Sequence, residues 1–294
     1  MVIFIIKNNK KISNIQSMKL SLKKIKKLKE ISKQLRINIL NTIFRVKKGH
    51  IGGSFSCIDI LICVYISNIF NFNKIDFQKK INDFFILSKG HSAIALYAIL
   101  DYLKISNDYN LNNFHKPGSL LMEHPSPNIK LPGIEIETGS LGNGLGVGTG
   151  IAFANKRNNK KTIVLVGDGE LYEGSNWEAM LLASHFKLQN LLVVIDRNFS
   201  ITLDKTEKIM KLENLKKKFV AFGFKTVVID GHNYSQLLTQ LQKFKIEKSI
   251  KPRCIICKTK KGKGSKVLES DLKFHHTVPN QTEYKTILKD LGAV

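Results

Sequence analysis

Apolar residues in the first part of the chain recur with helical spacing. Over residues 18–49 they return at steps of three and four, which predicts an amphipathic helix. The recurring positions are Ile25, Leu28, Ile31, Leu35 and Ile39. The glycines of GHIGG, residues 49–53, are expected to break this helix. Residues 57–70 are apolar nearly all round, which predicts a second helix that is buried.

Further along the chain, short apolar runs alternate with helical patterns. Residues 83–103 predict a strand, a turn at Lys89-Gly90 and a helix, and residues 137–155 a glycine-rich turn that becomes a helix. The other predicted strands are 162–167, 190–196, 225–230 and 252–259, and the other predicted helices are 174–186 and 234–244. This alternation is typical of an α/β fold with a doubly wound, mostly parallel sheet and helices on both faces. We therefore predict a single domain over residues 18–294.

Two segments lie outside this pattern. Residues 105–138 contain four prolines and predict a long loop, and a loop of this length in a compact domain usually carries function. At the amino terminus, nine lysines precede the first acidic residue, Glu30. We expect residues 1–17 to form a basic extension that can be disordered; a targeting segment, or an alternative start at Met18, stays open.

The charge balance limits the classes of partner. The chain has 47 Lys and Arg against 23 Asp and Glu, a formal net charge of +24. Such an excess favours polyanionic partners such as nucleic acids, membrane surfaces or phosphorylated metabolites. The lysines are scattered, however, and no aromatic-basic motif accompanies them, so compositional drift explains them better than a nucleic-acid surface. Because no apolar stretch approaches the ~20 residues that span a bilayer, we expect neither a nucleic acid nor a membrane as a partner.

The four cysteines favour a structural interpretation. Cys254 and Cys257 form a C-x-x-C within a predicted strand. Residues three apart on a strand point to opposite faces, so this pair suits neither a disulfide nor a shared metal ion. Cys57 and Cys63 offer no second C-x-x-C. Buried, reduced cysteines and a cytoplasmic location are the expectation.

Polar residues gather where two predicted strands end. In LVGDGELYEG, residues 165–174, Asp168 follows an apolar strand between two glycines, and Asn198 follows the next strand. Ligands of parallel α/β sheets bind beyond the carboxyl ends of strands, and adjacent strands would place these two side chains together. Carboxylate and amide oxygens suit Mg²⁺ or Ca²⁺, and Mg²⁺ is usually held by few protein ligands together with phosphates. The pair therefore predicts a cation site for a phosphorylated ligand.

Five segments in this order resemble transketolases, a family of thiamine-diphosphate-dependent enzymes. The segments are KGHIGGSFSCIDIL (48–61), ILSKGHSAIALYA (86–98), MEHPSPNIKLPGIEIETGSLGNGLGVGTGIA (122–152), GDGELYEGSNWEA (167–179) and KLQNLLVVIDRN (187–198). The resemblance covers about residues 20 to 280. It is greatest to the split form, in which the amino-terminal, diphosphate-binding half of transketolase is a separate polypeptide.

The resemblance implies roles for particular residues. The implied cation ligands are Asp168, Asn198 and the backbone carbonyl of Ser200. The implied cofactor contacts are Gly139, Leu141, Gly167, Asp168, Gly169, Asn198 and His91, with the Gly169 amide at the diphosphate. The implied catalytic residues are His50, His91, His124 and a late histidine, either His275 or its neighbour His276. Imidazoles suit proton transfer because they titrate near neutrality.

Other residues of the motif receive secondary interpretations. The resemblance places Glu173 and Glu178 near a contact between subunits. Glu170 is expected to be an acid at a helix start, where the helix dipole favours a negative charge. Trp177 is expected to contribute to packing.

The implied reaction is the reversible transfer of a two-carbon ketol group from a ketose phosphate to an aldose phosphate, with the cofactor as electron sink. In the family, a glutamate that activates the cofactor lies in a pyrimidine-binding domain, which would follow Val294. We therefore expect a separate carboxyl-terminal subunit, with two copies of each chain in the assembly, and sugar phosphates as substrates.

Two alternatives remain. One is a subunit of another thiamine-diphosphate enzyme, such as a deoxyxylulose-phosphate synthase or the alpha subunit of a 2-oxo-acid dehydrogenase, although SKGH and LPGIEIETGSLG favour transketolase. The other, less favoured because the motif residues are intact, is a degenerate binding protein with a basic surface.

Overall fold

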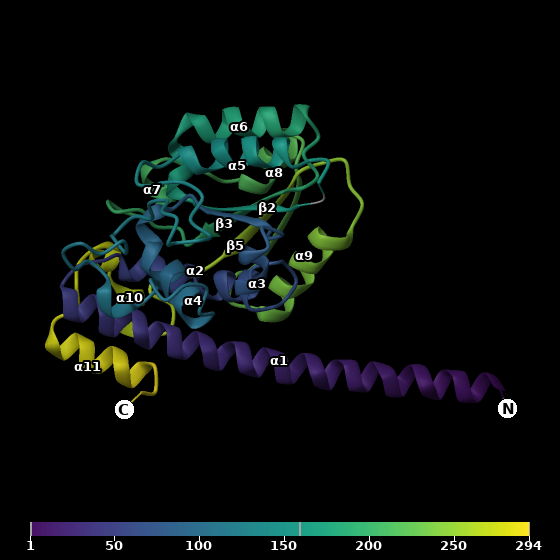
Figure 1. The fold of residues 1–294 in the computed structure, drawn as a ribbon, viewed down its shortest axis with the longest axis horizontal. Coiled ribbons are helices and arrows are strands. Elements are labelled where there is room, and N and C mark those ends of the chain that lie inside the picture. The colour runs from purple at the N-terminus through teal and green to yellow at the C-terminus, as the bar shows by residue number, and fades with distance from the viewer. Residues whose placement is uncertain (1, 159, 294) are drawn as a thin grey trace.

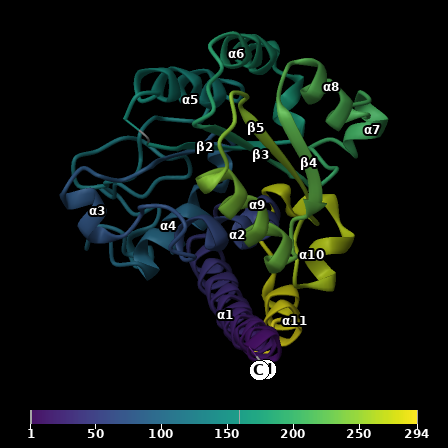
Figure 2. The same ribbon diagram turned by 90° about the vertical axis from the view of Figure 1, so that its right-hand side faces the viewer.

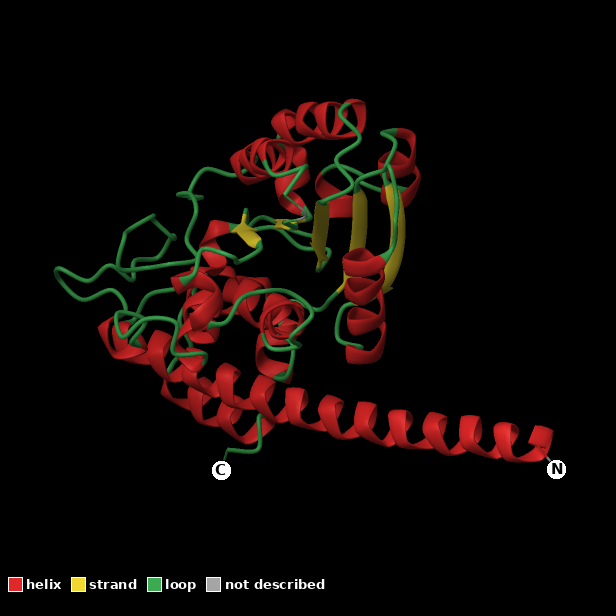
Figure 3. Cartoon of the chain, turned by 45° about the vertical axis from the view of Figure 1, so that its right-hand side comes forward, coloured by secondary structure: helices red, strands yellow, loops and turns green. Residues whose placement is uncertain are grey.

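Five parallel strands form one central sheet. A computed structural model describes residues 2–158 and 160–293, and their side chains from residue 22 onward. The strands are β1 (Phe84–Leu87), β2 (Thr162–Gly167), β3 (Leu191–Arg197), β4 (Lys225–Asp230) and β5 (Arg253–Lys258). Their order across the sheet is β1-β2-β3-β5-β4, and every pairing is parallel (Figures 1 and 3). The predicted α/β fold with a parallel sheet is confirmed.

Helices cover both faces of the sheet, as predicted. On one face lie α1 (Val2–Val46), α2 (Ile51–Tyr65), α4 (Ala93–Tyr102) and α9 (Tyr234–Ile246); on the other lie α5 (Asn143–Ala154), α6 (Gly174–His185) and α8 (Leu215–Ala221) (Figures 1 and 2). Successive strand residues point to opposite faces, so each strand feeds two separate cores: Ile163 packs with the first set of helices and Val164 with the second. The shorter helices are α3 (Lys74–Gln78), α7 (Thr206–Ile209) and α10 (Lys266–Ser270), and α11 (Gln281–Asp290) packs on α1.

The first two helices differ from their predicted bounds. The expected helix over 18–49 begins at Val2 and ends at Val46, because neither glycine nor proline interrupts this stretch. The helix therefore crosses the expected boundary at residue 18 without a break and projects well beyond the sheet (Figure 1).

The GHIGG segment breaks the helical path only in part. The second helix starts at Ile51 rather than at residue 57, so that Gly52 and Gly53 lie inside it. A Cβ atom on Gly52 would lie 2.7 Å from the backbone oxygen of Phe274 and 3.1 Å from Lys261 Cγ. These glycines therefore permit close packing of a distant loop against α2, which a local sequence pattern does not reveal.

The remaining expectations about the chain agree with the structure. Residues 105–138 form a loop with a single 3₁₀ turn at Leu111–Asn113. Cys254 and Cys257 pack in the cores on opposite faces of β5, and all four cysteines are buried and free. Among the described residues, no helix has an apolar stretch long enough to cross a bilayer.

Candidate cofactor and cation site

The carboxyl ends of β2 and β3 bring the predicted cation ligands together. Gly167 and Asp196 are partners in the register of these adjacent parallel strands. Asp168 follows β2 directly, and its backbone N–H donates to the Asp196 carbonyl at 3.3 Å. Asn198 follows β3 directly. The expectation that Asp168 and Asn198 lie at neighbouring strand ends is thus confirmed.

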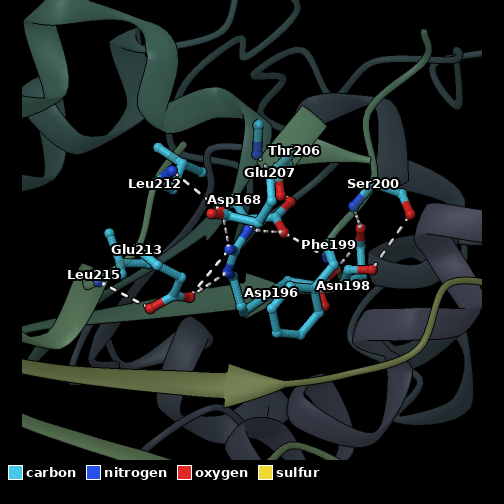
Figure 4. Close-up of polar contacts among 12 residues, drawn as sticks. Asp168, Asp196, Asn198, Phe199, Ser200, Thr206, Glu207, Leu212, Glu213 and Leu215 are labelled. Carbon is cyan, nitrogen blue, oxygen red and sulfur yellow. Dashed lines mark hydrogen bonds and ion pairs between the residues drawn. The ribbon is translucent and has the colours of Figure 1, made fainter. Parts of the chain in front are cut away.

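Asp168 is a buried carboxylate with fixed partners (Figure 4). One oxygen, Oδ1, accepts only the N–H of the adjacent Gly169, at 2.9 Å. The other, Oδ2, accepts the Phe199 N–H at 2.7 Å and faces Arg197 Nη1 at 3.1 Å. Burial raises the pKa of Asp168 to about 6, although the Arg197 guanidinium opposes the rise. The side chain therefore retains an acceptor oxygen and a charge that a bound cation would stabilise.

Arg197, the last residue of β3, was not anticipated from the sequence. Its side chain is almost fully buried and contacts Glu207 at 2.6 Å, Glu213 at 3.1 Å and the Thr206 hydroxyl at 2.6 Å (Figure 4). Because the guanidinium fork binds several acceptors in fixed directions, it ties the Asp168 turn to residues 206–213. This role depends on partners that lie up to 29 positions away in the sequence.

Asn198 and Ser200 lie in one tight turn beside Asp168 (Figure 4). Asn198 Oδ1 accepts the Ser200 N–H at 3.1 Å, and the Ser200 hydroxyl lies 3.4 Å from the Asn198 carbonyl. Within the described ranges, no cluster of three His, Cys, Asp or Glu side chains could hold a metal ion. A cation here would thus rely on one carboxylate, amide and carbonyl oxygens, and oxygens from a ligand, the pattern typical of Mg²⁺.

A cavity of about 270 Å³ lies at this end of the sheet. Most of the predicted cofactor residues line it: His91, Leu141, Gly167, Asp168, Gly169, Asn198, Ser200 and His275. A larger cavity of about 420 Å³ lies in the exposed 108–130 loop, but no predicted site residue lines it. We take the smaller cavity as the functional site because it holds the buried charges and the strand-end turns.

The predicted histidines converge beside this cavity. The ring of His50 lies 5.4 Å from that of His91, 6.2 Å from that of His124 and 5.4 Å from that of His275. His275 lines the cavity, whereas His276 is exposed and its ring lies 6.4 Å from that of His50. The structure therefore favours His275 as the late histidine.

Burial keeps these imidazoles neutral. It lowers the pKa of His50 to about 4, although Glu123 opposes the shift, and the pKa of His275 to about 3, where Lys261 adds to it. Burial also lowers the pKa of His91 well below its ordinary value. His50 Nδ1 lies 3.2 Å from Glu123 Oε1, but the two are not aligned for a hydrogen bond. Neutral imidazoles at pH 7 can accept protons from substrate hydroxyls.

Two lysines that sequence reasoning missed also line the cavity. Lys89 is fully buried, forms an ion pair with Asp196, and donates to the Gly53 carbonyl at 3.1 Å. Although burial acts to lower it, the Asp196 carboxylate raises the pKa of Lys89. Lys261 has a carboxylate partner nowhere among the described residues; its Nζ lies 2.8 Å from His275 Nδ1 and 3.2 Å from the Ile201 carbonyl. Burial and Lys89 lower the pKa of Lys261 to about 8.

The predicted Gly139 and Leu141 lie on a loop that packs against the SKGH turn. A Cβ atom on Gly90 would overlap the Thr138 carbonyl, so glycine there allows the two segments to touch. A Cβ on Gly139 would lie 3.7 Å from the His124 ring. This packing brings Leu141, which lines the cavity, to the same end of the sheet as Asp168.

Glu170 differs from its expected role. It is not an exposed acid at a helix start but a buried carboxylate that accepts hydrogen bonds from the Ser88 hydroxyl and from the N–H groups of Gly142 and Gly167, both at 3.0 Å. Burial raises its pKa. Glu170 therefore fixes the loops after β1 and β2 against the glycine-rich turn.

The remaining motif residues lie farther from the cavity. Trp177 packs against Phe219 and Phe222, as expected of a packing residue. Glu173 and Glu178 are exposed near the start of α6. Their expected place at a contact between subunits stays a prediction.

The fold and the site together define a class of protein. A parallel α/β sheet carries, at one end, a carboxylate and an amide on neighbouring strands, a lysine without a carboxylate partner and a group of neutral histidines. This combination suits a phosphorylated cofactor bound through a divalent cation. Comparison with known proteins identifies the family: residues 27–293 match the family described as transketolase, thiamine diphosphate binding domain. The chain belongs to this family.

Individual relatives agree with this assignment. The chain is 34% identical over 263 residues to one of the named subunits of the apulose-4-phosphate transketolase of Phocaeicola vulgatus, a match that covers 89% of this chain and 92% of that relative. It is 33% identical over 255 residues to the transketolase of Homo sapiens, covering 86% of this chain and 40% of that protein.

Solved structures show the same fold. Transketolase from Leishmania mexicana superposes with a TM-score of 0.82 at 26% identity, covering 90% of this chain and 41% of that one. Transketolase from Campylobacter jejuni gives a TM-score of 0.80 at 31% identity, covering 90% and 42%.

Proposed function

We propose that this chain is the amino-terminal subunit of a transketolase. It would transfer a two-carbon ketol group from a ketose phosphate to an aldose phosphate, using thiamine diphosphate and Mg²⁺, together with a separate pyrimidine-binding subunit. The observation that carries the proposal is the match to a relative that is named as one subunit of a transketolase, over 92% of that relative's length. The cavity supports it, because it gathers the residues that the family resemblance assigns to the cofactor.

The polar groups of the cavity fit a diphosphate and its cation. Asp168 Oδ1, the Asn198 amide oxygen and the Ser200 carbonyl would hold Mg²⁺, and the Gly169 N–H would face a phosphate oxygen. Lys261 offers a positive charge with no carboxylate partner among the described side chains, which suits an anionic ligand. Gly139, Leu141 and His91 would contact the rest of the cofactor.

The histidines perform the proton and hydroxyl chemistry in this proposal. When bound, thiamine diphosphate supplies an electron sink for breaking the carbon–carbon bond. His50, His124 and His275 orient the substrate by accepting hydrogen bonds from its hydroxyls. Because the pKa values of His50 and His275 are lowered by burial, both imidazoles are free to take up a proton at pH 7.

Cation binding should weaken in acid. The pKa of Asp168 is raised to about 6 by burial, and a cation binds the deprotonated form. As the pH falls below this value, protons compete and Mg²⁺ affinity should decrease by about tenfold per pH unit. Titration calorimetry of Mg²⁺ into chain with thiamine diphosphate, over about pH 5 to 8, measures this. The same titration of free thiamine diphosphate corrects for its own ionisation, and a corrected affinity that stays constant below pH 6 would contradict the assignment.

An exposed apolar face on α5 and α6 supports assembly with another chain. Phe153 is 51% exposed and Leu181 61% exposed, and Val147, Leu182 and Phe186 extend the same surface. Apolar patches of this kind are typical of protein–protein contacts. We assign this face to a contact within the proposed assembly.

Leu181→Lys should therefore weaken assembly by about tenfold or more without unfolding the chain, because the side chain is exposed in the isolated fold and would be buried at a contact. Sedimentation of the wild-type and variant chains, each mixed with the pyrimidine-binding subunit, measures this. Ile129→Lys is the matched control, since Ile129 is 97% exposed on the long loop. If both variants assemble like the wild type, the face is not an interface.

An assay of ketol transfer by the assembled enzyme tests the proposed function. Several ketose phosphate donors should be compared, among them apulose 4-phosphate, which the names of two relatives specify. Release of a two-carbon unit onto an aldose phosphate is the expected result. Synthesis of deoxyxylulose phosphate or decarboxylation of a 2-oxo acid, without ketol transfer, would replace transketolase by one of the alternative thiamine-diphosphate enzymes.

A further inference from the structure

His232 lies outside the cavity but has a fully specified hydrogen-bonding state. It belongs to the loop between β4 and α9, and its side chain is mostly buried. Its Nε2 accepts the backbone N–H of Lys260 at 2.9 Å, and its Nδ1 lies 2.7 Å from Asp59 Oδ2. A backbone N–H can only donate, so Nε2 carries no proton and Nδ1 donates to Asp59. The two partners therefore select a single neutral tautomer.

The Asp59 end of this contact is rigidly anchored. Asp59 lies on α2, where Arg36 of α1 contacts it at 2.9 and 3.1 Å, Ser32 at 2.6 Å and Tyr234 at 2.7 Å. Burial acts to raise the pKa of Asp59, but Arg36 and these hydrogen bonds hold it well below its ordinary value. Asp59 is thus a permanent carboxylate with its orientation fixed by three helices.

The Lys260 end leads directly to the cavity. The next residue, Lys261, reaches into the cavity and contacts His275. Two further contacts hold the same short segment: the Thr259 hydroxyl donates to Asp196, and the Gly262 N–H donates to the Gly52 carbonyl at 3.0 Å. The His232 contact lies between these two and is the one next to Lys261.

We propose that His232 is a positioning residue: it connects the fixed Asp59 carboxylate to the Lys260 backbone and so holds Lys261 beside His275 in the cofactor cavity. This inference rests on the proposed function, which makes Lys261 a partner of the diphosphate. His232 itself does not line the cavity. Its effect on the cofactor would therefore pass entirely through the backbone of residues 259–262.

Two substitutions separate the two halves of the contact. The amide of asparagine overlies histidine Nδ1, so His232→Asn keeps the contact with Asp59 and loses the acceptor for Lys260. The amide of glutamine overlies histidine Nε2, so His232→Gln keeps the acceptor and loses the donor to Asp59. His115→Asn, on the long loop, is the control for the same change elsewhere.

Hydrogen exchange of the full chain without cofactor is the first measurement. His232→Asn should exchange the Lys260 amide about tenfold faster than the wild type or more, whereas His232→Gln should keep its protection. The second measurement is the affinity of the assembled enzyme for thiamine diphosphate with Mg²⁺. His232→Asn should weaken it by about tenfold, and His232→Gln should leave it within about threefold, although the lost Asp59 contact lowers its thermal midpoint.

The order of the two variants decides the inference. A merely structural residue would make cofactor affinity follow thermal stability, so that His232→Gln would be the weaker binder; that result overturns the proposal. Wild-type exchange at Lys260 in His232→Asn also overturns it. Exchange requires no cofactor, so a wild-type assembly that fails to bind thiamine diphosphate would refute the proposed function and leave the exchange result interpretable.

Discussion

Asp168→Asn is expected to reduce the Mg²⁺-dependent affinity for thiamine diphosphate by about 100-fold or more. The substitution keeps the shape of the side chain and can still accept the Phe199 N–H, which lies 2.7 Å from Oδ2. It removes the one carboxylate available to a cation at the strand-end turn. Because the site would otherwise rely on amide and carbonyl oxygens, it would lose most of its attraction for Mg²⁺. Calorimetric titration of thiamine diphosphate with and without Mg²⁺ measures the loss.

Glu207→Gln is the matched control for this experiment. Both substitutions convert a carboxylate that pairs with Arg197 into an amide, but Glu207 lies outside the cavity. If the effect of Asp168→Asn came only from disturbing Arg197, Glu207→Gln would weaken cofactor binding similarly. Affinity that is unchanged in Asp168→Asn, or equally reduced in both variants, would contradict the assignment of Asp168 as the cation ligand.

The strands and their ends were accessible from the sequence because their information is local. A run such as TIVLV is apolar at every position after the first, which indicates burial on both faces of a parallel sheet. The first residues after two successive strands then place Asp168 beside Asn198, as the register of β2 and β3 confirms. Local pattern combined with the rule that ligands bind at strand ends therefore predicted this part of the site.

Residues whose role depends on a distant partner could not be found in this way. Lys89 looks like an ordinary turn lysine until Asp196 is placed beside it, and Glu170 looks like a helix-start acid until Ser88 and Gly142 surround it. Gly52 was misread as a helix breaker because its real neighbour is the backbone of Phe274, more than two hundred residues later. Buried charges need compensating partners, so such residues are recognised only after the tertiary contacts are known.

The pattern of compensation also shows where a ligand is needed. Lys89 is neutralised by Asp196, and Arg197 is shared among Asp168, Glu207 and Glu213. Lys261 has no such carboxylate among the described residues, and burial lowers its pKa to about 8. An incompletely compensated cation in a partly buried cavity favours an anionic ligand.

This chain alone is expected to show no measurable ketol transfer, and addition of the pyrimidine-binding subunit should restore it. The cavity residues account for the cation, the diphosphate and the substrate hydroxyls. The family resemblance assigns the glutamate that activates the cofactor to a second domain, and the matched relative from Phocaeicola vulgatus is itself named as one subunit of its enzyme. Titrating the second subunit into a fixed amount of this chain measures the dependence, with activity expected to saturate at equal amounts of the two chains. Sedimentation of the mixture should give the mass of two copies of each.

The Asp168→Asn chain makes this experiment specific. It changes the cavity but not the exposed face on α5 and α6, so it should associate with the second subunit but restore no turnover. Association without activity then shows that turnover requires this chain's cation site as well as contact between the subunits. Full turnover by the wild-type chain alone would refute the two-chain proposal, because the activating group would then have to lie within this polypeptide. Activity of the mixture that is insensitive to Asp168→Asn would instead place the working cofactor site entirely on the other subunit.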